Sequence, residues 1–197
     1  MTEESIIALL SALVGGIAAA LTAFQIYKIQ HKAQVTQKYI DEFLSDAMLH
    51  HRIAASQLRE RLRNHAALPP GDDDPFSIER LARGFWNAGP EVPYDYYKGP
   101  TDHHTGLNEH QSLEAILQYI SRLIMNIEKN YIDVNDFKSA VHGSFVWLDD
   151  LLFPLEMEIK KQTEKHRKEG GVVKAIDRIN KLQKLRDLLD LGRPRLD

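Results

Sequence analysis

Hydrophobic and polar residues are distributed unevenly along the chain. The 23 residues from Ser5 to Tyr27 include no charged side chain, and only Glu3 and Glu4 among the charged residues precede Lys28. A helix of about 20 apolar residues crosses the roughly 30 Å hydrocarbon core of a bilayer. Lipid offers no partner to the backbone of an open, non-helical segment. We therefore predict a transmembrane anchor over residues 1–28 and a soluble helical domain over 29–197.

A signal peptide or a buried helix would also be apolar, but both fit this run less well. A cleaved signal peptide has basic residues before a shorter apolar stretch, and a buried helix of a soluble protein is rarely apolar on every face. The basic residues follow the run instead, at Lys28, Lys32 and Lys38. Because basic flanks stay in the cytoplasm, we predict a single pass through the inner (cytoplasmic) membrane, with the N-terminus outside and the domain cytoplasmic.

Small residues recur at every fourth position of the predicted span. One row is Ser11, Gly15, Ala19 and Ala23, and a second row beside it is Ala12, Gly16 and Ala20. Small side chains let helices approach closely in lipid, where close packing drives their association. We therefore predict a homo-oligomer with contacts through Ser11, Gly15, Gly16, Ala19 and Ala23.

Beyond the span, apolar residues recur at steps of three and four, as they do in amphipathic helices. No proline or glycine occurs between Gly16 and Pro69, so we expect the span to continue directly into a second helix. The apolar seam of that helix is Ile40, Leu44, Ala47, His51, Ala54 and Leu58. A short helix over 75–86 and an irregular loop over about 87–107 follow.

Three more helices are predicted in the C-terminal half. The first follows a cap at Asn108, ends at Asn130, and has the stripe Leu113, Ile116, Leu117, Ile120, Leu123, Ile124 and Ile127. The second is capped by Asp133, buries Phe137, Val141, Phe145 and Leu148, and is expected to be interrupted at Asp149 and Asp150. After this interruption, Pro154 is expected to start or kink the helix that ends at Gly170 and Gly171. The third carries Ile176, Ile179, Leu182, Leu185 and Leu189. No strand alternation occurs, so we predict an all-α antiparallel bundle.

The amino-acid composition excludes several kinds of functional site. The chain has no cysteine, which excludes disulfides, thiolate metal sites and cysteine nucleophiles. Its net charge of −3 gives no overall attraction for nucleic acid. Histidines and carboxylates gather between Asp102 and His110, but their spacing matches no zinc pattern. We predict no metal and no cofactor.

Arg59 and His65 form the candidate catalytic pair. An arginine followed by a histidine four to six residues later resembles the signature of HEPN-type ribonucleases, in which the two side chains act on the scissile phosphate and the 2′-hydroxyl. Such spacing also arises by chance in an arginine-rich helix, and Glu60 follows Arg59 where that family has a polar residue.

The aromatic residues of the loop are candidates for ligand binding. Trp86, Tyr94, Tyr96 and Tyr97 could stack on a base or another flat ligand. Alternatively they close the open end of the bundle with their polar tips outward.

Charge is segregated along the chain. Residues 66–115 hold nine acidic and three basic side chains, whereas residues 159–195 hold twelve basic and five acidic ones. Opposite charges on one protomer favour docking within the domain or head-to-tail contact in a ring. The basic segment could instead contact anionic lipid or RNA.

The segments QKYIDEFLSDAMLHHRIAASQL and LQYISRLIMNIEKNYIDVNDFKSAVHGSFVWLDDLLFPL resemble a family of uncharacterised, mostly bacterial, membrane-anchored helical proteins, over about half of the chain. The features that carry this resemblance are Tyr131, Ile132 and Asp133 at a turn and Trp147, Pro154 and Leu155 in the helix after it. The order of parts also looks similar to the small membrane accessory protein of type VI-B CRISPR loci. That resemblance implies assembly as a membrane pore.

These observations predict a homo-oligomeric membrane protein, a pore-like effector or accessory in bacterial antiviral defence, whose partners are other copies of itself and the lipid bilayer. The alternative is a non-enzymatic anchor that displays its helices to a cytoplasmic protein or RNA partner. A HEPN-like ribonuclease is the third hypothesis.

Overall fold

The computed structural model describes residues 3–66, 78–79, 81–82, 109–165 and 172–191. Side chains are described in these ranges except those of residues 3–11, 61, 64–66, 109–110 and 172–175. The predicted all-α class is confirmed, since the described residues form helices and no strand. The helices are α1 (Glu3–Leu44), α2 (Asp46–Ala66), α4 (Glu109–Glu128), α5 (Val134–Lys165) and α6 (Val172–Leu189).

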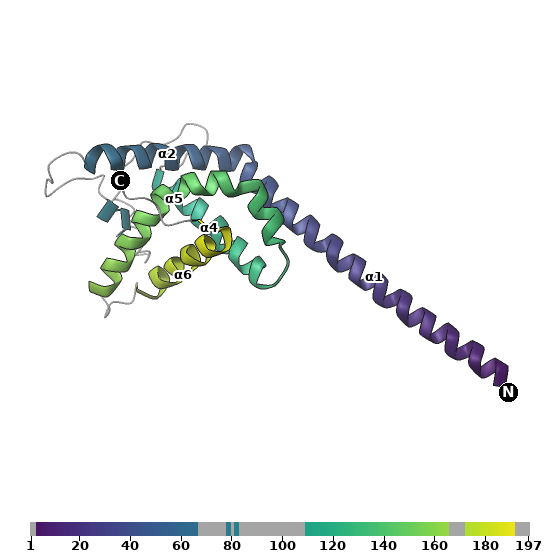
Figure 1. The fold of residues 1–197 in the computed structure, drawn as a ribbon. Coiled ribbons are helices and arrows are strands. Elements are labelled where there is room, and N and C mark those ends of the chain that lie inside the picture. Colours follow the sequence, from purple (N-terminus) through teal and green to yellow (C-terminus); the bar gives the residue numbers. More distant parts are fainter. Residues whose placement is uncertain (1–2, 67–77, 80, 83–108, 166–171, 192–197) are drawn as a thin grey trace.

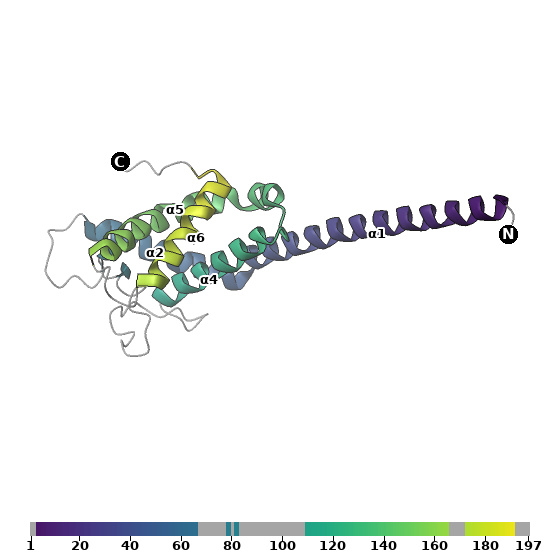
Figure 2. The same ribbon diagram turned by 90° about the horizontal axis from the view of Figure 1, so that it is seen from below.

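Helix α1 extends far out of the helical domain that the other helices form (Figures 1 and 2). It has 42 residues, and every described side chain from Ala12 to His31 is exposed. Among the described side chains of α1, the first buried one is that of Thr36, and Tyr39, Ile40 and Phe43 follow it into the core. One uninterrupted helix therefore joins the apolar run to the domain.

A helix break at Ser45 separates α1 from α2 (Figure 1), so the predicted second helix is divided, and its first residues belong to α1, which continues from the span to Leu44. The Ser45 hydroxyl accepts a hydrogen bond from the Met48 backbone N–H at 3.3 Å, as an N-cap side chain does. The break also changes the phase of the apolar seam. Leu44 is 51% exposed and Ala47 is exposed, whereas Ala54 and Leu58 are buried as predicted.

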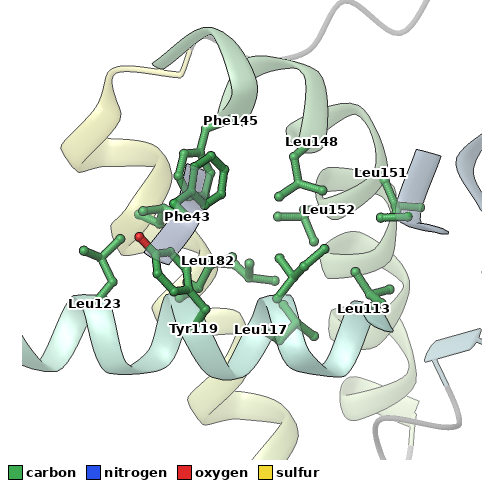
Figure 3. Packing of buried hydrophobic residues seen from close by; sticks show 14 of the residues in the cluster. Phe43, Leu113, Leu117, Tyr119, Leu123, Phe145, Leu148, Leu151, Leu152 and Leu182 are labelled. Carbon is green, nitrogen blue, oxygen red and sulfur yellow. The ribbon is translucent and has the colours of Figure 1, made fainter. Parts of the chain in front are cut away.

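Buried residues of α1, α2, α4, α5 and α6 form one core. Figure 3 shows the part of it to which α1, α4, α5 and α6 contribute. The rings of Phe43 and Phe145 stack with their centroids 4.6 Å apart, and Phe43 also contacts the fully buried Tyr119. Aromatic residues of α1, α4 and α5 therefore pack together. The predicted stripe of α4 is confirmed, because all its members are buried except Ile127, which packs against the core while partly exposed.

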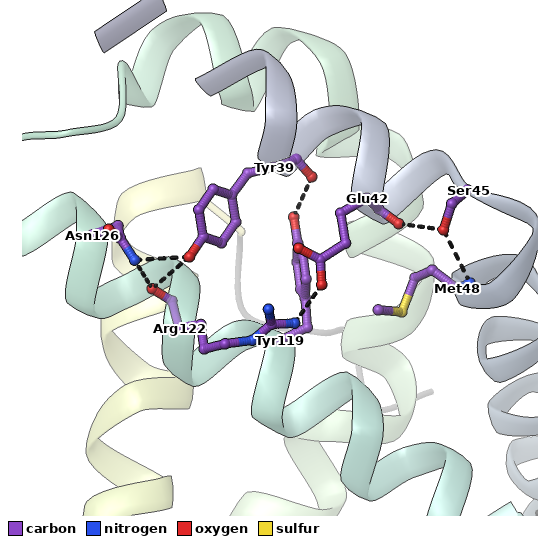
Figure 4. Close-up of polar contacts among 7 residues, drawn as sticks. All are labelled: Tyr39, Glu42, Ser45, Met48, Tyr119, Arg122 and Asn126. Carbon is purple, nitrogen blue, oxygen red and sulfur yellow. Dashed lines mark hydrogen bonds and ion pairs between the residues drawn. The ribbon is translucent and has the colours of Figure 1, made fainter. Parts of the chain in front are cut away.

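Polar contacts also join the end of α1 to α4 (Figure 4). The Tyr119 hydroxyl donates to the Tyr39 carbonyl oxygen at 2.8 Å, and Asn126 Nδ2 donates to the Tyr39 hydroxyl oxygen at 2.7 Å. Arg122 forms an ion pair with Glu42. Burial raises the pKa of the Tyr39 hydroxyl. Because these bonds reach both the backbone and the side chains of α1, they fix its orientation relative to α4.

The turn from α4 to α5 follows the sequence prediction. Asn130 has a positive φ of 58°, which ends α4. The Asp133 carboxylate accepts hydrogen bonds from the Asn135 and Asp136 backbone N–H groups and so caps α5. These backbone bonds, that of Asp136 first, lower the pKa of Asp133.

The predicted interruption of α5 at Asp149 and Asp150 is wrong. The helix runs for 32 residues and contains Pro154 in its interior. Asp149 is tolerated there because Arg186 of α6 pairs with it and with the buried Glu156. Burial alone would lower the pKa of Arg186, but hydrogen bonds to the two carboxylates raise it overall. A buried three-residue ion network therefore holds α6 against α5.

In the last helix, Ile179, Leu182, Leu185 and Leu189 are buried as predicted, whereas Ile176 is 43% exposed. The short helix predicted over 75–86 is described only at 78–79 and 81–82, which are helical. Leu81 and Ala82 are buried there, and the Glu79 carbonyl oxygen accepts a bond from Gln162 Nε2 at 3.0 Å. This segment therefore packs against α5.

Candidate functional site

The exposed part of α1 is the first candidate functional surface. It is a helix near the N-terminus that is long and apolar enough to cross a membrane. Leu13, Val14, Ile17 and Leu21 are all more than half exposed. A Cβ atom added at Gly15 or Gly16 would meet no other atom within 4 Å. The domain of the same chain therefore leaves this apolar surface entirely uncovered.

The predicted contact residues lie within this exposed stretch. Gly15, Gly16, Ala19 and Ala23 belong to the exposed helix, whereas the side chain of Ser11 lies outside the described residues. Their spacing places them along one side of α1, because a helix advances about 100° per residue. Self-association through these residues remains a prediction.

A groove of about 390 Å³ between α2 and α5 is the second candidate surface. Apolar and polar side chains from both helices line it: Leu49, Arg52, Ile53, Ser56, Gly143, Ser144 and Trp147. Leu49 is 42% exposed and Ile53 is 45% exposed. Gly143 leaves open space on the α5 side, since a Cβ atom there would also meet nothing within 4 Å.

Arg52 gives the groove its chemistry. Its Nε atom is buried without a hydrogen-bond partner, and its Nη1 atom lies 3.4 Å from the Ser144 hydroxyl oxygen. The guanidinium lies over the Phe43 ring, 4.8 Å from the centroid. Burial lowers its pKa, and no carboxylate of the described residues pairs with it. A half-buried cation that no carboxylate of the described residues neutralises favours an anionic group in the groove.

The predicted catalytic arginine lies one helical turn beyond the groove. Arg59 forms an ion pair with Asp150 and lies over the Trp147 ring, 5.8 Å from its centroid. A phosphate would have to compete with Asp150 for this guanidinium. The side chain of His65 lies outside the described residues, as do Trp86, Tyr94, Tyr96 and Tyr97.

The segregated charges pair within the domain where the structure describes them. Arg178 makes two hydrogen bonds to the Glu114 carboxylate, at 2.6 and 2.7 Å, which join the basic segment to the acidic one. These contacts favour the first of the alternatives for the charge pattern, docking within one protomer. Within the described residues, no group of three or more histidines and carboxylates could hold a metal ion.

Sequence reasoning missed the α2–α5 groove and Arg52. Arg52 lies in a run of helix-forming residues and carries no motif. The one sequence feature that could have indicated a groove was the mixture of apolar and polar residues around Arg52, with Ile53 next to it and Ser56 one helical turn further on. The groove depends on how α2 crosses α5, which only the tertiary structure establishes.

The chain matches no protein-family model, no curated protein and no solved structure.

Proposed function

We propose that this protein is a single-pass membrane protein that self-associates through α1 and holds its helical domain beside the bilayer. The observation that carries the proposal is the exposure of α1 from Ala12 to His31, with Gly15 and Gly16 free of any contact from the described part of the chain's own domain. An apolar helix without a protein partner requires lipid or another apolar helix around it. The basic residues after the span favour a cytoplasmic domain in the inner membrane.

The resemblance to the small membrane accessory protein of type VI-B CRISPR loci implies a more specific function: a pore-like effector or accessory in bacterial antiviral defence. The continuous helix from span to domain supports an assembly in which both parts are ordered together, because a break occurs only at Ser45, beyond the first residues that enter the core. A ring of such protomers would place the spans side by side.

The proposal is tested by substitutions in the span. Gly15→Leu or Gly16→Leu should reduce the number of protomers per particle, because a bulky side chain separates helices that pack through small residues. Leu21→Phe is the matched control, since it adds bulk on the opposite side of α1. Native mass spectrometry of the detergent-solubilised protein measures the assembly. If both glycine variants keep the wild-type mass, α1 is an anchor without a role in association.

A membrane-anchored adaptor is the second candidate, and the α2–α5 groove favours it. The Arg52 guanidinium, which pairs with no carboxylate of the described residues, lies beside the exposed Leu49 and Ile53 and fits an acidic, amphipathic helix of a cytoplasmic protein. A photo-crosslinking residue at Leu49 should then capture a stoichiometric partner, and Arg52→Gln should abolish the adduct. The same residue placed at the exposed Met125 of α4 is the control. Adducts of equal yield at both positions would remove the groove from consideration.

A further inference from the structure

The turn between α4 and α5 lies beside α1 at the point where the helix leaves the domain (Figures 1 and 2). Three polar contacts hold it there. Lys32 Nζ donates to Asn130 Oδ1 at 3.1 Å and lies 3.6 Å from the Asp133 carboxylate. The Asp133 backbone N–H donates to the Thr36 hydroxyl at 2.8 Å, and that hydroxyl donates to the Lys32 carbonyl oxygen. The turn is therefore fixed to the stretch of α1 that directly follows the apolar run.

A column of rings runs from the apolar run to this turn. The Tyr27 ring stacks on His31 with centroids 5.9 Å apart and planes 8° apart. The His31 ring meets the edge of Tyr131 at 6.0 Å. Tyr131 is 45% exposed although its neighbour Ile132 is fully buried. The turn thus directs a large aromatic side chain outward, next to α1.

The position of Tyr131 along α1 sets its depth relative to a bilayer. Tyr27 is the last residue of the uncharged run, and His31 lies four residues, or about 6 Å, beyond it. The headgroup region on each side of the hydrocarbon core is about 5–7 Å thick. A side chain that contacts His31 therefore lies at headgroup depth when the apolar run fills the hydrocarbon core.

The neighbouring side chains suit that layer. Tyrosine concentrates at membrane interfaces because its ring is apolar and its hydroxyl is polar. Lys28 extends over the Phe24 ring, with its Nζ atom 4.6 Å from the centroid, so its charge stays at the end of the apolar run. Lys129 is exposed on the turn itself. Asp133 and Lys32 neutralise each other.

We propose that the α4–α5 turn is a second membrane contact, in which Tyr131 inserts into the phospholipid headgroup layer of the bilayer that α1 crosses. The inference rests on the proposed span. A single span leaves a domain free to rotate about its axis and to tilt in any direction. The contact at Tyr131 selects one direction, because it keeps the α4–α5 side of the domain against the lipid.

The absence of cysteine allows a direct test of depth. Single cysteines replace Tyr131, Met157 or Ile17 in the full chain, are spin-labelled, and are reconstituted in phosphatidylcholine vesicles. Met157 is 49% exposed on the second half of α5 and serves as the control in water. The label at 17 should show the oxygen accessibility of hydrocarbon, and the label at 131 should show an intermediate, headgroup value. If the label at 131 is as accessible to water as the label at 157, while the label at 17 shows the oxygen accessibility of hydrocarbon, the second contact is overturned and the span is not. Water-like values at 17 overturn the span and the contact together.

A second measurement separates the role of Tyr131 from its position. A label at Lys129→Cys reports on the depth of the turn when Tyr131 itself is varied. Tyr131→Trp should keep the label at headgroup depth, whereas Tyr131→Asp should move it to water, because a carboxylate does not enter the interface. An unchanged depth in Tyr131→Asp would show that α1 places the turn and that Tyr131 contributes nothing.

Discussion

Removing Arg186 should destabilise the domain more than any other single change at a charged residue described above. Its side chain is 12% exposed, and those of Asp149 and Glu156 are 8% and 4% exposed. Its Nε atom lies 3.0 Å from Asp149 Oδ1, and its Nη2 atom lies 2.7 Å from the same oxygen. Arg186→Met leaves both carboxylates buried without a cation. Breaking a buried ion pair in this way costs about 3–5 kcal/mol of unfolding free energy.

Lys184 provides the control on the same helix. It pairs with Glu128, but the two side chains are 44% and 49% exposed. Because exposed pairs contribute about 0–1 kcal/mol, Lys184→Met should change the unfolding free energy little. Adding Asp149→Asn and Glu156→Gln to Arg186→Met should recover most of the loss, since the uncompensated charge is then gone.

Urea unfolding of the full chain in detergent micelles, followed by tryptophan fluorescence, measures these effects. Trp147 lies on α5, the helix that carries both carboxylates. Equal losses in Arg186→Met and Lys184→Met would refute the assignment of the network as buried. Alternatively, the neutral carboxyl substitutions could fail to recover the unfolding free energy that Arg186→Met removes. That result would show that packing of the arginine, including its contact with the Phe153 ring, outweighs its charge.

Three further predictions concern the junction between α1 and the domain. Ser45→Ala removes the cap of α2 at the Met48 amide and should cost about 0.5–2 kcal/mol in a urea titration. Tyr119→Phe removes one buried hydrogen bond to the Tyr39 carbonyl and should cost about 1 kcal/mol, with unchanged far-UV circular dichroism. The pKa of Asp133 is lowered in the folded state, so its stabilisation is present above its ordinary value of 3.8 and is lost as pH falls through the folded-state pKa. Asp133→Asn should therefore flatten the acid limb of the stability–pH profile, and an identical profile would contradict that assignment.

Local signals predicted several elements of the fold correctly. The stripe of α4 has an unbroken helical period, and Asp133 and Asn130 are residue types with strong preferences for helix starts and ends. Such features depend on residues only a few positions apart. They are therefore visible in the sequence and were found at the predicted positions.

Features that depend on distant partners were not predictable. Asp149 interrupts an apolar stripe in the sequence, and its counter-charge, Arg186, lies 37 residues away on another helix. The break at Ser45 contains neither proline nor glycine, and it leaves Leu44 exposed as the chain turns to pack α2 on α4. The groove at Arg52 arises from the same tertiary arrangement. The predicted span, by contrast, depends only on composition and length, and the structure has a helix there that is long and apolar enough to cross a membrane.

Because α1 is one continuous helix, a change in the tilt of its apolar part also moves the end that is attached to the domain. From Tyr27 to Leu44 the helix is about 26 Å long, so a change of about 10° in its tilt displaces its end by about 4–5 Å. Bilayers of different thickness impose different tilts on a span of fixed length. Because the core and the turn beside Thr36 are attached to this same helix, the whole domain moves with it. If α1 crosses a bilayer, a change in bilayer thickness therefore displaces the domain sideways, because no hinge separates the span from the domain.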